Sequence, residues 1–358
     1  MDNKRAGALM RKLLNALCVG VAAFAAVTIS AAQAADKYPI RALGTFQGQM
    51  QSSHVEKPFF EALAKDPNYE VQFRTMDEVG LKGFDAMRML KLGVFNVMAV
   101  QLGYVSGDEP FVLGLDLPGV APDLKTAQKV VNAYREQFDK YLRDKYNAYT
   151  VALWPFPGQV FFCRTEIGGL ADLKGKKIRS FTPAMGSLIE HFGGIPVSLA
   201  FSEVYQSLQR GVADCGITAT LSGNTSKWFE VTSHLYPLSI GWGIQAHMAN
   251  KDFIDKMSPE ARDTLLKKFK KLEDDMWDLS FKTFDDGVNC NTGVGACEYG
   301  TKANMKLVNI KPADIEALRQ AASAVILPAW AKDCNAKFPD CSKVWNQTVG
   351  AAVGLEIK

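Results

Sequence analysis

Asp172-Leu-Lys-Gly-Lys-Lys-Ile-Arg179 opens the stretch of sequence that decides the fold. It continues through Gly193-Gly-Ile-Pro-Val197 and Ala200-Phe-Ser-Glu-Val-Tyr205 to Leu208-Gln-Arg-Gly-Val-Ala-Asp214. Short apolar runs alternate here with amphipathic segments, and the same alternation extends over the rest of the chain. This pattern is typical of an α/β fold.

Two helices within this stretch have recognisable boundaries. Thr182 followed by Pro183 predicts a helix start, and Gly193 with Gly194 predicts its end. Ser202 is expected to cap the next helix, which should stop at Gly211. Buried strands are predicted by apolar runs at 71–73, 94–100, 150–153, 160–163, 177–181 and 212–218.

The longest predicted helix runs from Ser258 to about Asp286. Ser258 and Pro259 mark its start, and apolar residues then recur every three or four positions. At about 1.5 Å per residue it would exceed about 40 Å, enough to connect two lobes. A two-part helix with a break would show the same periodicity.

The first 35 residues read as a secretory signal. Four basic residues precede an apolar run at 13–29, which closes on Ala32-Gln33-Ala34, a small-x-small cleavage pattern. A membrane anchor is the alternative, but the run is marginal for a span. We therefore expect a signal peptide at 1–35 and a periplasmic location.

Charge balance argues against a nucleic-acid partner. The chain has 41 basic and 38 acidic residues, and the predicted signal holds four of the basic residues and one of the acidic ones, which leaves 37 of each. A neutral exported chain of this length fits two lobes and has no basic surface for nucleic acid.

Six cysteines follow the predicted signal. Cys290 and Cys297 are seven residues apart, as are Cys334 and Cys341, and an exported protein favours disulfides within each pair. Cys163 and Cys215 would then pair with each other or remain buried thiols. A zinc site is the alternative, but the spacing matches no common zinc motif and no histidine lies beside these cysteines.

Motifs for catalysis are missing from the sequence. There is no Gly-x-Ser-x-Gly elbow, no complete phosphate-binding loop and no dinucleotide fingerprint. The four histidines form no metal-binding pair. We therefore expect no enzyme activity, no cofactor and no metal.

Taken together, in this order and spacing, the blocks between 172 and 214 resemble the solute-binding proteins of tripartite ATP-independent periplasmic (TRAP) transporters, the DctP-like family. Leu90-Lys-Leu-Gly-Val-Phe-Asn96, Asp116-Leu-Pro118, Phe229-Glu-Val231 and the Ser258-Pro259-Glu260 helix start agree with it. The resemblance covers essentially the whole exported chain.

The resemblance implies a two-lobe α/β periplasmic binding protein of type II-like architecture, with a long helix spanning both lobes. Lobe I is expected at 36–157 and 243–283, and lobe II at 158–242 and 284–358. The lobes would close on a small organic carboxylate, a mono-, keto- or dicarboxylate. The partner would be the membrane permease of a TRAP transporter, driven by an ion gradient.

Arg179 matches the family's carboxylate-binding arginine. A guanidinium at the end of a strand can hold a carboxylate through two parallel hydrogen bonds, which lysine cannot do. From composition alone a surface or salt-bridge arginine would be the simpler interpretation. The resemblance favours the binding role.

Other expected ligand contacts are mostly uncharged. Phe201 matches an aromatic that packs on the ligand's carbon skeleton, although it could also staple the following helix. Trp154 and Trp242 are candidates for an apolar wall or for the core. The polar candidates are Thr218, Gln101, Gln159 and Gln245.

Departures from the family bear on the substrate. Gln159 stands where some relatives have a second arginine, Thr218 where an asparagine is frequent, and Gln101 where some use a carboxylate. One arginine among neutral polar groups indicates a small monocarboxylate or keto acid rather than a polyhydroxylated sugar acid. Three alternative functions remain: a binding protein of another transporter or of a sensor, a periplasmic enzyme acting on a carboxylate, and a structural adaptor.

Overall fold

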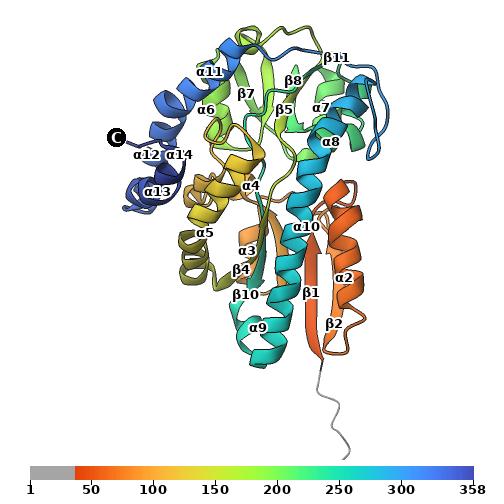
Figure 1. Cartoon of the computed structure of the whole chain (residues 1–358), viewed down its shortest axis with the longest axis vertical. Coiled ribbons are helices and arrows are strands. Elements are labelled where there is room, and N and C mark those ends of the chain that lie inside the picture. Colours follow the sequence, from red (N-terminus) through yellow and green to blue (C-terminus); the bar gives the residue numbers. More distant parts are fainter. Residues whose placement is uncertain (1–36) are drawn as a thin grey trace, which may run out of the picture. The chain divides into compact units, whose positions relative to one another are not determined.

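Two β-sheets organise the chain, and each gathers strands that are far apart in the sequence (Figure 1). The computed structural model describes residues 37–358, which form one compact unit. The predicted signal, 1–35, lies outside the described residues. Within 37–358, no helix combines the length and the apolar character that a membrane crossing requires.

The first sheet has the strand order β2-β1-β3-β10-β4. β1 is parallel to β2 and β3, whereas β10 is antiparallel to both β3 and β4. β10 therefore returns to a sheet that the chain left almost one hundred residues earlier. The strands are β1 (Tyr38–Gly44), β2 (Tyr69–Thr75), β3 (Val97–Gln101), β4 (Ala148–Trp154) and β10 (Gln245–Asn250).

The second sheet has the order β11-β9-β5-β8-β6-β7. β6 is parallel to β7 and β8, and β5 is antiparallel to β8 and β9. Its strands are β5 (Gln159–Cys163), β6 (Lys177–Ser180), β7 (Ile195–Ser198), β8 (Cys215–Ala219), β9 (His234–Tyr236) and β11 (Lys306–Leu307).

Helices and short turns cover these sheets. Those that follow strands of the first sheet are η1 (Ser52–Glu56), α2 (Lys57–Leu63), α3 (Ala86–Lys91), α4 (Leu102–Val105), η2 (Pro110–Leu115), α5 (Leu124–Tyr146) and α9 (Lys251–Asp255). Those within the second sheet's segment are η3 (Leu170–Leu173), α6 (Pro183–His191), α7 (Phe201–Arg210), α8 (Thr220–Thr225) and η4 (Trp228–Glu230).

One helix, α10 (Pro259–Thr292), contacts both sheets. It is unbroken over 34 residues, about 50 Å long, and is capped at its start by Ser258, whose Oγ accepts from the Ala261 N–H at 3.2 Å. It contacts β4 of the first sheet, β9 of the second sheet and α8, which lies beside the second sheet. Figure 1 shows α10 passing from one sheet to the other. The predicted long helix is confirmed, and it continues six residues beyond Asp286 because its buried face extends to Cys290 and Asn291.

The chain passes between the sheets three times, at 155–158, at 237–244 and along α10, which leads from β10 to β11. The second crossing is held by Asp116, whose carboxylate accepts from the N–H groups of Trp242 at 2.9 Å and Ile244 at 3.1 Å. Gly243, between them, has φ +58°, a left-handed conformation that favours glycine.

The C-terminal helices contact elements beside both sheets. They are α11 (Pro312–Ala321), η5 (Ala322–Ile326), α12 (Leu327–Lys337), α13 (Cys341–Trp345), η6 (Asn346–Gly350) and α14 (Ala351–Val353). η6 and α14 contact α5, whereas η5 contacts α6. The lobe boundaries given above therefore stay a prediction, above all for residues 312–358.

Helix boundaries in the segment that decides the fold were predicted with one error. Thr182 caps α6 through an Oγ1 contact with the Met185 N–H at 2.9 Å, and Gly211 ends α7 with φ +73°. The expected Ser202 cap is wrong, because α7 begins at Phe201 and the Ala200 N–H is taken by the Glu203 carboxylate at 3.1 Å.

All six cysteines in the described residues form disulfides. Cys290–Cys297 and Cys334–Cys341 join as expected, and Cys163 pairs with Cys215. The last two face each other across β5 and β8, which is the register that brings their side chains together. The prediction of disulfides rather than a zinc site is confirmed.

Candidate ligand-binding site

A cavity of about 40 Å³ lies where strand ends of the two sheets meet. Gln101 ends β3, and Gln245, directly opposite in register, begins β10. Gln159 begins β5, and Thr218 lies on the neighbouring β8. Side chains from both sheets therefore line one space: Thr45, Phe46, Gln49, Met76, Gln101, Tyr104, Phe156, Gln159, Arg179, Phe181, Phe201, Thr218, Ser222 and Gln245.

Arg179 on β6 is the one charged side chain among the described residues lining this cavity, and it is only 1% exposed. Its Nε donates to the Leu199 carbonyl at 3.1 Å and its Nη1 to the Ile217 carbonyl at 2.7 Å. Its Nη2 donates to the Tyr104 hydroxyl at 3.2 Å. These contacts fix the orientation of the guanidinium.

Two of the five N–H groups of this guanidinium remain free, one on Nη1 and one on Nη2. Such a pair is the fork that binds a carboxylate through two parallel bonds. None of the ion pairs among the described residues includes Arg179. Burial lowers the pKa of Arg179, but an arginine stays protonated, so a buried positive charge faces the cavity.

Aromatic rings form the apolar wall. The Phe181 ring centroid lies 4.8 Å from Arg179 Cζ, which places the cation over its face. Phe201 lies between Phe46 from the first sheet's segment, at 5.8 Å between ring centroids, and Trp228, at 5.6 Å. The wall is thus made of phenylalanines from both segments.

The two tryptophans proposed for this wall lie elsewhere. Trp154 is fully buried, and its Nε1 donates to His247 Nδ1 at 2.9 Å. Trp242 donates to the Ala121 carbonyl at 3.0 Å and lines a separate groove beside α10. Both bury their rings in packing outside the cavity, so of the two alternatives, wall or core, the structure has the core.

The glutamines present amide groups to the cavity. Gln101 Oε1 accepts from the Tyr104 N–H at 3.1 Å, and Gln245 Nε2 donates to Thr45 Oγ1 at 3.0 Å. Gln245 Oε1 is buried without a partner among the described residues. Gln159 is 3% exposed, and its side chain has no hydrogen bond to any described residue.

The structure brings all six sequence-predicted residues to this one cavity: Arg179, Phe201, Thr218, Gln101, Gln159 and Gln245. Their roles in ligand binding stay predictions. Sequence reasoning missed Tyr104 and Phe181, although both had a signal. Tyr104 follows the strand-ending Gln101 by three residues, and Phe181 lies two residues after Arg179, the spacing of one strand face.

Contacts join the two segments around the cavity. Ser222 donates to Gln49 Oε1 at 2.6 Å, and the Tyr104 hydroxyl accepts from both Arg179 and the Phe201 N–H. At the surface, Lys82 pairs with Glu203 at 2.7 Å.

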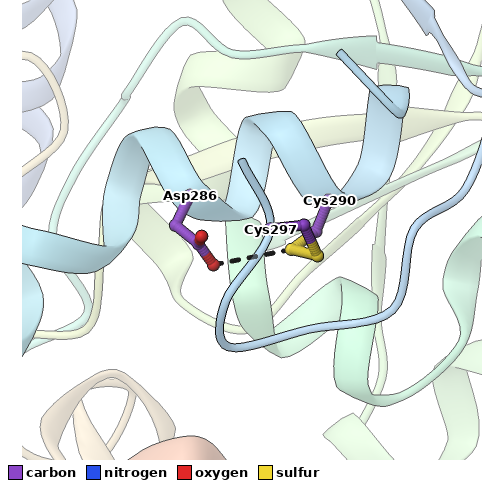
Figure 2. A group of neighbouring side chains, drawn as sticks. All are labelled: Asp286, Cys290 and Cys297. Atoms are coloured by element: carbon purple, nitrogen blue, oxygen red, sulfur yellow. Dashed lines mark hydrogen bonds between the residues drawn. A yellow bond between two sulfur atoms is a disulfide. The ribbon is translucent and has the colours of Figure 1, made fainter. Parts of the chain in front are cut away.

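A second cluster, Asp286 with Cys290 and Cys297, has the composition of a metal site (Figure 2). Its two sulfur atoms are joined in a disulfide, so neither is a thiolate that could bind a metal. The Asp286 carboxylate accepts from the N–H groups of Glu298 at 2.7 Å and Tyr299 at 3.1 Å. The cluster therefore anchors a loop.

Two β-sheets covered by helices, three crossings between them and a cavity between strand ends define a two-lobed binding protein. Residues 47–333 match the DctP family, described as bacterial extracellular solute-binding protein, family 7. The chain belongs to this family, which confirms the predicted resemblance. It is a family of solute-binding proteins and not of enzymes, as expected.

Known proteins agree with this assignment. The chain is 26% identical over 221 residues to the ectoine-binding periplasmic protein TeaA of Halomonas elongata, a match that covers 60% of this chain and 64% of TeaA. It thus spans less than two thirds of that relative.

Two solved structures share the fold. One is a TRAP periplasmic solute-binding protein from Desulfovibrio salexigens with bound orotic acid; the TM-score is 0.77 at 17% identity, covering 88% of this chain and 100% of that one. The other is DctP7 of Bordetella pertussis, an extracytoplasmic solute receptor binding pyroglutamic acid; the TM-score is 0.74 at 17% identity, covering 86% and 99%.

Proposed function

We propose that this chain is a periplasmic binding protein that captures a small organic carboxylate and delivers it to the ion-gradient-driven permease of a TRAP transporter. The observation that carries the proposal is Arg179, a buried cation with two free N–H groups and no acidic partner among the described residues. A buried charge without a counter-ion is costly. A bound carboxylate would neutralise it.

The cavity's single charge favours a monocarboxylate. A second carboxylate would leave a net negative charge buried beside neutral amides and phenyl rings. The glutamines and Thr218 suit an uncharged polar group on the ligand, and the phenylalanines suit a compact apolar or planar skeleton. Sugar acids with many hydroxyl groups would need more polar partners than these.

Some relatives have ligands of this class. Ectoine, orotic acid and pyroglutamic acid, which three of them are described as binding, are compact molecules with one carboxyl group. Others are described with C4-dicarboxylates, malonate or glucuronate, so the proposal of a monocarboxylate rests on the single charge of the cavity. The predicted signal at 1–35 supports export to the periplasm, and the TRAP description of one similar structure supports the permease partner.

Binding is tested by thermal shift of the protein lacking residues 1–35 against a panel of organic acids. A ligand at about a thousand times its dissociation constant should add about 4 kcal/mol to the free energy of unfolding. Arg179→Ala should weaken binding at least about a hundredfold. Arg210→Ala, which removes an exposed arginine of α7, is the matched control.

If no acid raises the melting temperature, or if Arg179→Ala responds like the wild type, carboxylate capture is wrong. Delivery is tested separately, by uptake into vesicles that contain the permease. Uptake that requires ATP, rather than an ion gradient, would assign the protein to another transporter class.

A further inference from the structure

The orientation of one cavity amide is fixed by the backbone. Gln101 Oε1 accepts from the Tyr104 N–H at 3.1 Å at the start of α4. A backbone N–H only donates, so the atom that faces it must be the amide oxygen. The NH₂ group of Gln101 therefore occupies the other position, on the side of the cavity.

Residues 37–358 provide no acceptor for this NH₂ group. Gln101 is 8% exposed, and no described residue accepts a hydrogen bond from its Nε2. Gln159 contributes a second amide close by. A Cβ at Gly243 would lie 2.7 Å from Gln159 Nε2 and 3.6 Å from Gln101 Nε2, so both nitrogens lie around the same point. Both glutamines line the cavity, so a ligand there can accept from these donors and take them out of water.

The missing partner must be an acceptor that carries no charge. Arg179 already balances one carboxylate, and the described lining offers no other cation for a second. An ammonium group on the ligand would meet the donors of Gln101, which repel it. A carbonyl oxygen satisfies both requirements.

We propose that Gln101 is a specificity-determining residue that donates to a neutral carbonyl oxygen of the ligand. The protein then selects monocarboxylates that bear a second carbonyl, such as keto acids and lactam acids. It discriminates against the same skeletons with a methylene or ammonium group at that place. This inference rests on the proposed function, because Arg179 must first hold the carboxylate.

Matched acids test the selection by isothermal calorimetry. Two pairs differ by the carbonyl alone: 4-oxopentanoate with pentanoate, and 3-oxocyclopentanecarboxylate with cyclopentanecarboxylate. In at least one pair the carbonyl compound should bind about 10- to 100-fold more tightly, as expected for a buried donor that would otherwise be unpaired. Equal affinities within both pairs would overturn the inference while leaving carboxylate capture intact.

Gln101→Glu assigns the effect to this residue. A glutamate keeps an oxygen on the Tyr104 N–H but replaces the NH₂ donor with an acceptor. Its added charge weakens both members of a pair, so the ratio of the two affinities is the readout. That ratio should fall to about one, whereas Gln72→Glu, an exposed site on β2, should leave it unchanged.

An unchanged ratio in Gln101→Glu would show that the carbonyl is recognised elsewhere and would overturn the assignment. Proline provides an independent check, because its ring nitrogen is an ammonium group. In Gln101→Glu, the affinity for proline should rise relative to the affinity for pyroglutamate. If the wild type binds none of these acids, nor any acid of the wider panel, the proposed function itself fails.

Discussion

Glu273 and Arg179 are both buried charges, but their surroundings differ. Glu273, on α10, pairs with Arg135 at 2.7 Å and accepts from the Leu153 N–H at 2.7 Å, which ties α10 to α5 and β4. Arg179 has two backbone carbonyls and a hydroxyl, and no described carboxylate. The comparison teaches that a buried charge whose partners are complete maintains the fold, whereas one whose partners are incomplete is suited to a ligand.

Asp116 is a third buried charge, and its set of partners is intermediate between those of Glu273 and Arg179. Asp116 is held by backbone N–H groups of the second crossing and has no cation partner among the described residues. Burial raises the pKa of Asp116 to about 6, although the N–H groups of Trp242, Ile244 and Gly243 act to lower it. Substitutions at the three sites should therefore separate three different effects on stability.

The largest effect is expected at Glu273. Glu273→Ala leaves the half-buried Arg135 without its partner and the buried Leu153 N–H without an acceptor, and it should cost about 2–4 kcal/mol of the free energy of unfolding. Glu273→Gln, which keeps an oxygen for Leu153, should cost less. Urea denaturation measures both. If Glu273→Ala costs under about 1 kcal/mol, the distinction between structural and functional buried charges breaks down.

Asp116→Asn should change the pH dependence of stability. The folded protein holds the Asp116 proton more strongly than the unfolded chain, whose aspartates titrate near pH 3.9, so unfolding releases it and rising pH destabilises. Between about pH 4 and pH 7, wild type should lose about 2–3 kcal/mol relative to Asp116→Asn. Urea denaturation of both proteins at four pH values gives the difference; parallel curves would contradict it.

The smallest effect is expected at Arg179 in the ligand-free protein. Arg179→Met removes an uncompensated buried charge but leaves the Leu199 and Ile217 carbonyls without their donor. The gain and the loss should roughly offset, so the free energy of unfolding should change by only about 1 kcal/mol in either direction. The variant should nevertheless gain no stability from any acid that stabilises the wild type. A loss of several kcal/mol without ligand would instead make Arg179 a structural residue.

Local patterns predicted much of this fold because they depend on neighbours in the chain. Thr182-Pro183, Gly211 and the periodicity of α10 specify helix boundaries through contacts a few residues away. The prediction that Ser202 caps α7 failed because the Glu203 side chain, one residue later, accepts from the Ala200 N–H at the start of the helix. Two candidate caps in a row cannot be ranked by pattern alone.

Contacts between distant segments were beyond such reasoning. Tyr104 and Arg179 are 75 residues apart and meet through the pairing of the two segments. Strand β10 was not predicted. It pairs with β3, which places Gln245 beside Gln101, and this pairing forms only after the chain returns from the second sheet. Wall and core stayed open alternatives for the tryptophans, because sequence position near a crossing does not say which side a ring faces.

The bonds of α10 also locate a mechanical weak point. Trp277 and Ser280 donate to the carbonyls of Leu153 and Pro155, at the end of β4. The next anchor is the Phe284 carbonyl, which accepts from Thr220 beside the second sheet. Between Ser280 and Phe284 lies about one helical turn. The helix is fixed to the first sheet on one side of this turn and to the second sheet on the other. Bending of one sheet against the other would therefore strain this turn of the helix.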